Sequence, residues 1–139
     1  MKKLVKKQAT GGILIFDNRA LIIQRAKDEK YLPSFWEIPS GKKEPFESLK
    51  AAAEREFKEE TGIAVRVVKP VHVFKYLVEK ETDIRDVTQT DFLVKAKGKP
   101  KVTLSAEHQN YAWLSKEEID NYDLSKEIKE ALKKAFGSL

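Results

Sequence analysis

Three glutamates, Glu56, Glu59 and Glu60, have the residue type and the spacing for metal chemistry. They lie in residues 47–60, a segment without Gly, Pro or Asn that is rich in Ala, Glu and Lys and therefore predicts a helix. Positions i, i+3 and i+4 share one side of a helix, so these carboxylates repel one another at the negative end of the helix dipole. A bound cation relieves that repulsion, and hard oxygen ligands suit Mg²⁺ or Mn²⁺ better than zinc.

The alternative is a solvated acidic helix end whose charges are paired with Lys50, Arg55 and Lys58. The residues before the helix favour the metal site. Residues 40–47, Ser-Gly-Lys-Lys-Glu-Pro-Phe-Glu, form a glycine-containing loop that runs into the helix N-terminus. In such a loop, backbone N–H groups and a carbonyl can face a phosphate or a metal.

From Gly41 to Ile63 the sequence resembles the Nudix box of the Nudix hydrolases, G-x5-E-x7-R-E-U-x-E-E-x-G-U, where U is a bulky apolar residue. The defined positions are filled by Gly41, Glu47, Arg55, Glu56, Phe57, Glu59, Glu60, Gly62 and Ile63. So many fixed residue types at fixed spacings make a chance match improbable. One position departs from the pattern. The family often has two glycines after the proline, whereas Pro39 is followed by Ser40, and serine tolerates a positive φ less well than glycine.

The resemblance implies an α+β fold, a Nudix-type α/β/α sandwich with a mixed β-sheet, with residues 1–139 forming a single Nudix hydrolase domain. It also implies roles for the residues at the matching positions. Glu56, Glu59 and Glu60 would be ligands of the divalent metal, with the carbonyl of Ser40 as a further ligand. Glu47 and Arg55 would form a buried pair that holds the loop against the helix and supports catalysis.

Hydrolysis of a pyrophosphate bond also needs a group that takes a proton from the attacking water. Two candidates remain open at this stage. One is the box residue Glu59. The other is Glu107, because residues 104–113 resemble the late loop that supplies a base or an extra metal ligand in several Nudix branches. In the alternative interpretation Glu107 and His108 are simply solvated loop residues; His108 is expected to orient a neighbour or to face water.

Two cations are candidates for binding substrate phosphate. Arg25, at the end of a predicted strand, would contact phosphate with its planar fork, and Lys42 in the box loop would act as a point charge. A surface role is the alternative for both. Four aromatic residues could stack on a nucleobase, although aromatic side chains are more often part of the core, which is the role favoured for Trp113. The four are Phe35, Trp36, Phe74 and Trp113.

The surrounding elements are predicted from apolar patterning. Residues 13–16 and 21–25 predict a hairpin, and strands are expected at 63–68, 71–78 and 87–96, the first two separated by Lys69-Pro70. A short strand around 111–113, a capping box at Ser115 and a helix over 125–136 complete the chain. Gly62 is expected to end the helix of residues 47–60 in the left-handed conformation.

Composition restricts the remaining possibilities. The chain has 139 residues, a net charge of +5, no Cys and two His, which excludes disulfides, thiolate catalysis and Cys-based zinc sites. No apolar run approaches the roughly 20 residues that span a bilayer, and no recognition helix or aromatic basic strand predicts a stable nucleic-acid partner. We therefore expect a cytoplasmic protein. The resemblance implies a small nucleotide substrate and is compatible with a homodimer.

The resemblance thus predicts a Mg²⁺-dependent hydrolase, with Mn²⁺ as a substitute. It would cleave a pyrophosphate bond of a nucleoside triphosphate or a related nucleoside diphosphate derivative and release a nucleoside monophosphate. Two alternatives remain. One is a dinucleoside polyphosphate or nucleotide-sugar hydrolase, in line with the Ser-x-Glu-His-Gln-x-Tyr-x-Trp pattern of residues 105–113. The other is a non-catalytic nucleotide-sensing module.

Overall fold

Two long neighbouring strands, β1 (Lys3–Phe16) and β6 (Asp83–Ala96), run parallel through the centre of the sheet in a computed structural model that describes residues Met1–Leu139. The other strands pair antiparallel. They are β2 (Arg19–Arg25), β3 (Trp36–Glu37), β4 (Ser40–Lys42), β5 (Val65–Glu79) and β7 (His108–Leu114). The strand order is β3-β2-β1-β6-β5, with β4 joined to β1 and β7 to β2. The sheet is therefore mixed, as predicted.

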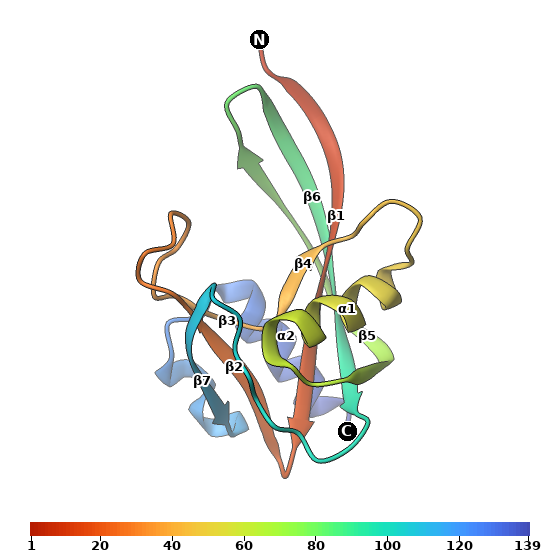
Figure 1. Ribbon diagram of the computed structural model, residues 1–139, viewed down its shortest axis with the longest axis vertical. Coiled ribbons are helices and arrows are strands. Elements are labelled where there is room, and N and C mark those ends of the chain that lie inside the picture. Colours follow the sequence, from red (N-terminus) through yellow and green to blue (C-terminus); the bar gives the residue numbers. More distant parts are fainter.

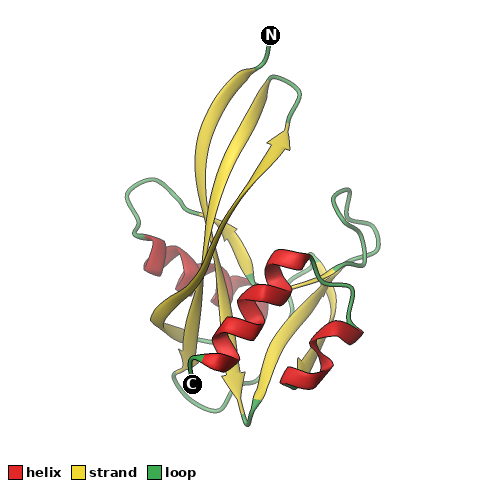
Figure 2. Cartoon of the chain, turned by 180° about the vertical axis from the view of Figure 1, so that it is seen from behind, coloured by secondary structure: helices red, strands yellow, loops and turns green.

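One helix covers each face of this sheet, α1 (Leu49–Thr61) and α2 (Lys126–Gly137), and a short 3-10 helix, η1 (Lys116–Asn121), precedes α2 (Figures 1 and 2). Successive side chains of β1 point to opposite faces. Ile13 accordingly packs in the core under α2, and Leu14 packs in the core under α1. These two apolar layers confirm the predicted α/β/α sandwich. Neither helix has the length and apolarity that crossing a bilayer requires.

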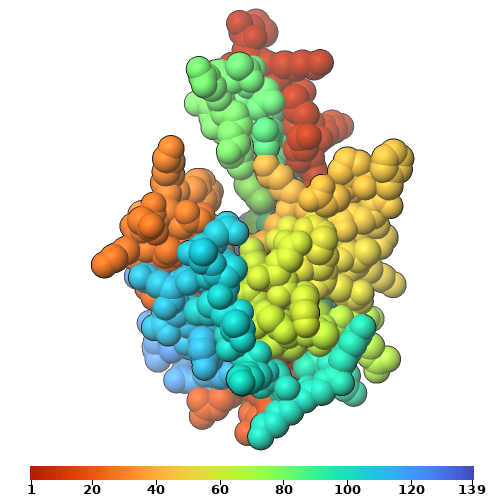
Figure 3. All heavy atoms as spheres, in the orientation of Figure 1, coloured from red at the N-terminus to blue at the C-terminus, as the bar shows by residue number.

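The sheet extends beyond the helices as a β-arm made of residues 3–8 of β1, 73–79 of β5 and 83–88 of β6 (Figure 1). In the space-filling view it stands clear of the body, with the N-terminus at its tip (Figure 3). The arm arises because β1 pairs with β6 along its whole length, starting at Lys3 opposite Asp83. The sequence pattern did not predict the first parts of these two strands. It placed the starts at residues 13 and 87, whereas the strands begin at Lys3 and Asp83. Backbone pairing does not require apolar side chains, so the lysine-rich start of the chain forms a strand while its side chains stay in solvent.

The remaining predicted elements differ in their limits. The expected break at Lys69-Pro70 is absent, since β5 continues through it with two register shifts, between Val67 and Lys69 and between Pro70 and His72. Bulges and an edge position tolerate a proline because no partner needs its missing N–H. The hairpin is confirmed, with both turn residues, Asp17 and Asn18, at positive φ. The helix after Ser125 and the capping box at Ser115 are confirmed as well.

Helix α1 begins later than predicted, and the difference places Glu47 outside it. Ser48 is the N-cap residue, and its Oγ accepts a hydrogen bond from the N–H of Ala51 at 3.0 Å. Serine at this position competes with helical backbone and so fixes the start. The expected left-handed end at Gly62 is confirmed, with φ 75°. Glu47 therefore lies in the loop ahead of the helix.

Phe57 attaches α1 to the sheet. Its ring is fully buried, and a Cβ added to Gly12 in β1 would lie 2.6 Å from its Cδ2 atom, so the ring rests directly on the backbone of the central strand. We expect Phe57→Ala to lower the free energy of unfolding by about 3–5 kcal/mol, because it removes a fully buried ring and leaves a cavity between α1 and the sheet. Urea denaturation measures the loss. Lys58→Ala, at the next and exposed position of the same helix, should change stability by no more than about 0.5 kcal/mol; equal losses in both variants would contradict this packing.

Candidate active site

The box loop packs so closely against α1 that only a glycine fits at position 41. Gly41 lies in β4, and a Cβ placed on it would collide with the carboxyl group of Glu56. Neither Ser40 nor Gly41 has a positive φ. The serine that departs from the family pattern therefore introduces no backbone strain. The glycine is needed for space rather than for its conformational freedom.

Arg55 connects the loop to the helix. Its Nε and Nη2 donate to the two carboxylate oxygens of Glu47 at 3.1 and 2.7 Å, and Nη2 also donates to the carbonyl of Lys42 at 3.0 Å. Its Nη1 donates to Glu56 at 2.9 Å and to Glu59 at 3.3 Å. The hydrogen bonds from Arg55 hold the pKa of Glu47 well below its ordinary value, at about 2. Arg55 thus fixes the loop and two of the three box carboxylates at once.

Glu60 is held differently from its two neighbours. Its carboxyl group is buried and accepts a hydrogen bond from the backbone N–H of Ser40 at 3.0 Å. Its pKa is raised to about 9, chiefly by burial and also by the nearby carboxylates of Glu37, Glu56 and Glu107. Burial likewise raises the pKa of Glu56, although Arg55 opposes the shift. Ionised carboxylates are therefore costly at this end of α1.

Glu107 reaches the same end of α1 from the loop before β7. The backbone of that loop is anchored there, since Ser105 N–H donates to the carbonyl of Glu60 at 3.3 Å and Glu107 accepts from the N–H of Ala26 at 2.9 Å. The Glu107 side chain is exposed and forms no hydrogen bond or ion pair in the structure. The fold thus brings the charge of Glu107 close enough to raise the pKa of Glu56 and of Glu60, although the residues are far apart in sequence.

This group of residues fits a divalent cation. It offers carboxylate oxygens and, at Ser40, a backbone carbonyl, which are the ligands that Mg²⁺ and Mn²⁺ prefer. Arg55 compensates Glu56 and Glu59, but no cationic side chain contacts the carboxylate of Glu60. A dication would favour the ionised form of Glu60 and offset the cost of its burial.

A cavity of about 470 Å³ opens beside the box loop. Tyr31, Phe35, Trp36, Phe74 and Tyr76 supply its aromatic walls, and residues 40–42 border it on the side of the box. Of the four aromatic residues singled out in the sequence, only Trp113 lies elsewhere: it packs on the core under α1, with its ring centroid 6.3 Å from that of Phe16. Trp36 both lines the cavity and packs edge-on against Tyr122.

The two predicted phosphate-binding cations, Arg25 and Lys42, differ in whether their charged groups already have partners in the protein. Arg25 lines the cavity, yet its Nε donates to the carbonyl of Tyr31 at 2.8 Å and its Nη2 to Glu29 at 3.2 Å. Its Nη1 lies 3.6 Å from Glu37. Arg25 therefore holds the loop of residues 26–35 in this structure. Lys42 lines the same cavity and has no ion-pair partner.

Sequence reasoning missed the pair of His108 and Glu37. The His108 side chain is 1% exposed, and its Nε2 lies 2.8 Å from Glu37 Oε2, while Nδ1 faces Ser105 Oγ at 3.3 Å. The interpretation of His108 as a solvated loop residue is therefore wrong. The pair joins β7 to β3 across 71 positions of sequence, so no local signal could reveal it.

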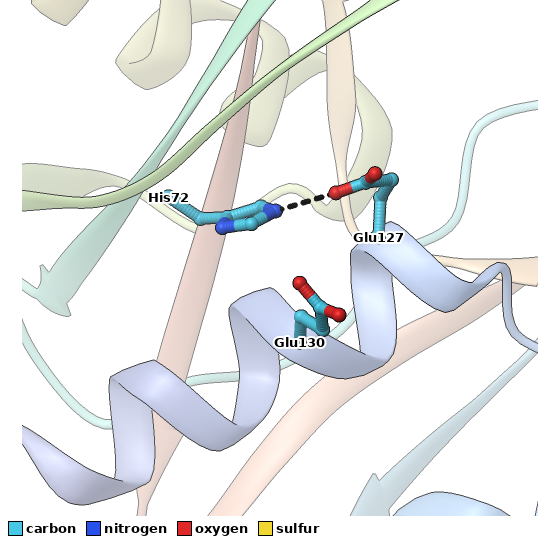
Figure 4. Close-up of side chains that lie close together, drawn as sticks. All are labelled: His72, Glu127 and Glu130. Atoms are coloured by element: carbon cyan, nitrogen blue, oxygen red, sulfur yellow. Dashed lines mark hydrogen bonds and ion pairs between the residues drawn. The ribbon is translucent and has the colours of Figure 1, made fainter.

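A second polar group that the sequence did not reveal lies on the α2 side (Figure 4). His72, Glu127 and Glu130 place three ligand atoms within 4.8 Å of one another. However, Lys134 Nζ lies 2.8 Å from His72 Nδ1 and can only donate to it. The proton of the neutral ring is then on Nε2, which donates to Glu127 at 2.8 Å. Both ring nitrogens are engaged, so this group is a hydrogen-bonded chain at the edge of the cavity that Glu127 lines.

Asp91 lies opposite His72 in the sheet and is fully buried. Its Oδ1 accepts a hydrogen bond from Gln89 Nε2 at 2.8 Å, whereas Oδ2 has no partner. Burial raises its pKa to about 6. The Asp91 carboxyl group crowds the backbone of Gly11 in β1, where an added Cβ would overlap it.

Comparison with known proteins shows what the whole chain is similar to. The model of the NUDIX domain matches residues 6–135. A nucleoside triphosphatase, NudI of Klebsiella pneumoniae (strain 342), is 25% identical over 114 residues, 76% of this chain and 79% of that protein. The crystal structure of a MutT protein from Methanosarcina mazei Go1 has a TM-score of 0.77 at 23% identity, covering 99% of this chain and 96% of that one. An Ap4A hydrolase of C. elegans has a TM-score of 0.68 at 26% identity and 96% coverage of both chains.

The matched model spans nearly the whole chain, so the chain belongs to the Nudix family. It is an enzyme of the pyrophosphohydrolase type, acting on phosphoric anhydrides. The predicted family and fold class are confirmed.

We expect Gly41→Ala to reduce hydrolysis about 100-fold, because the new Cβ must displace the Glu56 carboxyl group and a shift of about 1 Å at a reactive site has that effect. Steady-state kinetics on the substrate with the highest turnover measures it. Gly98→Ala is the matched control, since nothing lies within 4 Å of the added Cβ there. Unchanged turnover in Gly41→Ala would contradict the close approach of loop and helix.

Asp91 should make stability depend on pH. Because its folded pKa, about 6, lies above its ordinary value of 3.8, the native state binds more protons than the unfolded state between these values. The free energy of unfolding therefore falls as pH rises from about 4 to about 6, by roughly 3 kcal/mol. Denaturation at a series of pH values should show that Asp91→Asn removes this part of the slope. Asp120→Asn, at an exposed position, should retain it.

Proposed function

We propose that the protein is a divalent-cation-dependent hydrolase of nucleoside triphosphates, which cleaves a pyrophosphate bond and releases a nucleoside monophosphate. The observation that carries this proposal is the assembly of Glu56, Glu59, Glu60 and Glu107 at one end of α1, beside a cavity with aromatic walls. The activity printed for NudI, a nucleoside triphosphatase, supports the same substrate class.

Glu56, Glu59, Glu60 and the carbonyl of Ser40 would hold the cation, Mg²⁺ or Mn²⁺. When bound, the ion neutralises charge on the phosphate oxygens and lowers the pKa of a coordinated water. Arg55 and Glu47 keep the loop at the distance from α1 that lets Ser40 and the helix carboxylates face one site. Their role is positioning, and it does not require contact with substrate.

We assign the general base to Glu107 rather than to Glu59. The Glu59 carboxylate already accepts two hydrogen bonds from Arg55 Nη1, both at 3.3 Å, and is a ligand candidate. Glu107 has a free, exposed carboxylate beside the same site. A free carboxylate can accept a proton from water and release it to solvent.

The nucleoside would bind in the aromatic cavity. Phe35, Phe74 and Tyr76 offer stacking surfaces, and Glu127 and Gln89 offer polar groups to the edge of a base. Lys42, at the border between cavity and box, would contact the phosphates as a point charge. Arg25 would shape the wall by holding residues 26–35, and would reach phosphate only after leaving its present partners.

A dinucleoside polyphosphate is the second candidate substrate. The Ap4A hydrolase of C. elegans matches this chain over 96% of both lengths, and residues 105–113 carry the Ser-x-Glu-His-Gln-x-Tyr-x-Trp pattern. A nucleotide sugar would present the same pyrophosphate linkage. The complete set of box acids favours any of these reactions over a non-catalytic sensor. We further propose that residues 1–139 act as one domain in the cytoplasm, where nucleotide substrates are available, and that dimerisation is not needed to complete the site.

A substrate panel tests the reaction. Nucleoside triphosphates, oxidised nucleotides, diadenosine polyphosphates, ADP-ribose and nucleotide sugars are incubated with Mg²⁺ or Mn²⁺, and products are resolved by chromatography. We expect a nucleoside monophosphate and pyrophosphate from a triphosphate, and no turnover with chelator. Glu107→Gln should lower kcat by about 10²- to 10⁴-fold with little change in the metal concentration needed, because only the proton acceptor is lost. Glu60→Gln should raise that metal concentration.

Glu117→Gln, at an exposed acid on η1, is the control and should behave as wild type. Full turnover in both Glu107→Gln and Glu60→Gln would contradict the assignment. Tight nucleotide binding without turnover by the wild-type protein would indicate a sensing module instead.

A further inference from the structure

Four cationic side chains follow the β-arm from its base, where Lys42 lies, to the turn at its tip, which holds Lys80; we call Lys7, Lys42, Lys80 and Arg85 the basic patch. Lys42 in β4 pairs with Ala9 of β1, and Ala9 lines the aromatic cavity. Lys7 lies two residues before Ala9 in β1. Val5 lies two residues before Lys7, and Arg85 of β6 pairs with Val5. Side chains directly opposite or two residues apart share one face of a sheet. These cations therefore continue the face that lines the cavity.

Lys80 joins the patch from the turn between β5 and β6, which is closed by a hydrogen bond from Lys80 N–H to the carbonyl of Asp83 at 2.8 Å. Burial lowers the pKa of Lys42, and the charges of Arg85, Lys80 and Lys7 lower it further, whereas Asp83 raises it. Lys7, Lys42 and Lys80 form no ion pair in the structure. Asp83 is the only acid within ion-pair distance of Arg85, at 3.6 Å from its Nε. The patch therefore has an excess of positive charge.

The need to keep an exposed sheet edge from pairing with another sheet does not explain all four cations of the basic patch. Lysines on an exposed edge strand prevent pairing with another sheet, and that explains Lys7 on the outer side of β1. Arg85 lies on β6, which has β1 on one side and β5 on the other. Its side chain is 26% exposed, and its buried Nε lacks a hydrogen-bond partner. Arg85 is thus a partly buried guanidinium in the middle strand whose Nε lies 3.6 Å from Asp83 without a hydrogen bond, so its donors are not fully used.

The patch begins where the candidate active site ends. Lys42 follows Gly41, which touches Glu56, and the carbonyl of Lys42 accepts from Arg55. The same residue lines the cavity. A nucleotide with its base in the cavity would carry its phosphates past Lys42, and the next cations along the β-arm are Lys7, Arg85 and Lys80.

We propose that the basic patch binds the terminal phosphates of the substrate, those beyond the bond that is cleaved, so that the enzyme favours longer phosphate chains. This inference rests on the proposed function. Planar donors of Arg85 would hold phosphate oxygens directly, and the lysines would act as point charges. A nucleoside diphosphate leaves the patch empty, a triphosphate reaches its near end, and a tetraphosphate or dinucleoside polyphosphate occupies more of it.

The test compares two double variants with the same charge change. Lys7→Gln with Arg85→Gln alters the patch. Lys6→Gln with Arg66→Gln is the control, because Lys6 points to the opposite face of β1 and Arg66 is an exposed residue at the far end of β5. Both are assayed with the di-, tri- and tetraphosphate of one nucleoside, and thermal unfolding verifies that both are folded. The diphosphate is measured as a substrate or, if it is not cleaved, as a competitive inhibitor.

We expect the patch variant to raise KM about tenfold for the triphosphate, and more for the tetraphosphate, with kcat within about twofold. The constant for the diphosphate should change by less than about twofold, and the control should match wild type for all three. The KM of the wild type should also rise more steeply with NaCl than that of the patch variant, because salt screens exposed charges.

Equal effects in both double variants, or no effect that depends on phosphate number, would overturn the proposal. So would an oligonucleotide without a 5′-triphosphate that inhibits the wild type but not the patch variant, since the patch would then bind nucleic acid. If the wild type cleaves no triphosphate, the proposed function fails separately. Calorimetry with inorganic tripolyphosphate then decides on the patch: binding by wild type and control but not by the patch variant supports it, and the absence of that difference overturns it.

Discussion

The site depends on the hydrogen bonds that Arg55 donates to the carboxylates around the end of α1. Negative side chains there repel each other and the helix dipole, and Glu60 is buried as well. Arg55 offsets this cost by donating to Glu47, Glu56 and Glu59 and, through the carbonyl of Lys42, holds the box loop in place. It leaves the buried Glu60 without a cationic side-chain partner, and this deficit is the electrostatic argument for the divalent ion that we propose.

The sheet decides what surrounds that site. The parallel pairing of β1 with β6 runs from the core to the tip of the β-arm, so one continuous face carries the buried Asp91, the wall of the cavity and the basic patch. Helix α1 binds to the opposite face through Phe57. The edge formed by β4 lies between the two, and there Gly41 faces Glu56 while the adjacent Lys42 faces the cavity. A nucleotide can therefore meet acids, aromatic rings and cations within a short distance.

Local signals predicted most of the secondary structure and failed where pairing partners are distant. Runs of β-branched and other apolar residues marked the apolar halves of β1 and β6, but their lysine- and arginine-bearing halves are strands only because each provides backbone hydrogen bonds to the other. Pro70 marked a break that a bulged edge strand tolerates. The two-residue strand β3 gave no signal of its own, yet it places Glu37 beside His108 and at the cavity.

The sequence by itself determined the family, the fold class and the residues of the box, because these depend on side-chain types at short, fixed spacings along one loop and one helix. Only the tertiary structure decided that Arg25 is occupied by Glu29 and Tyr31, that Glu107 lies beside Glu56 and that Arg85 shares a face with Lys42. Each of these relations joins separate loops or strands, and their distances are set by strand register and helix packing rather than by neighbours in the chain.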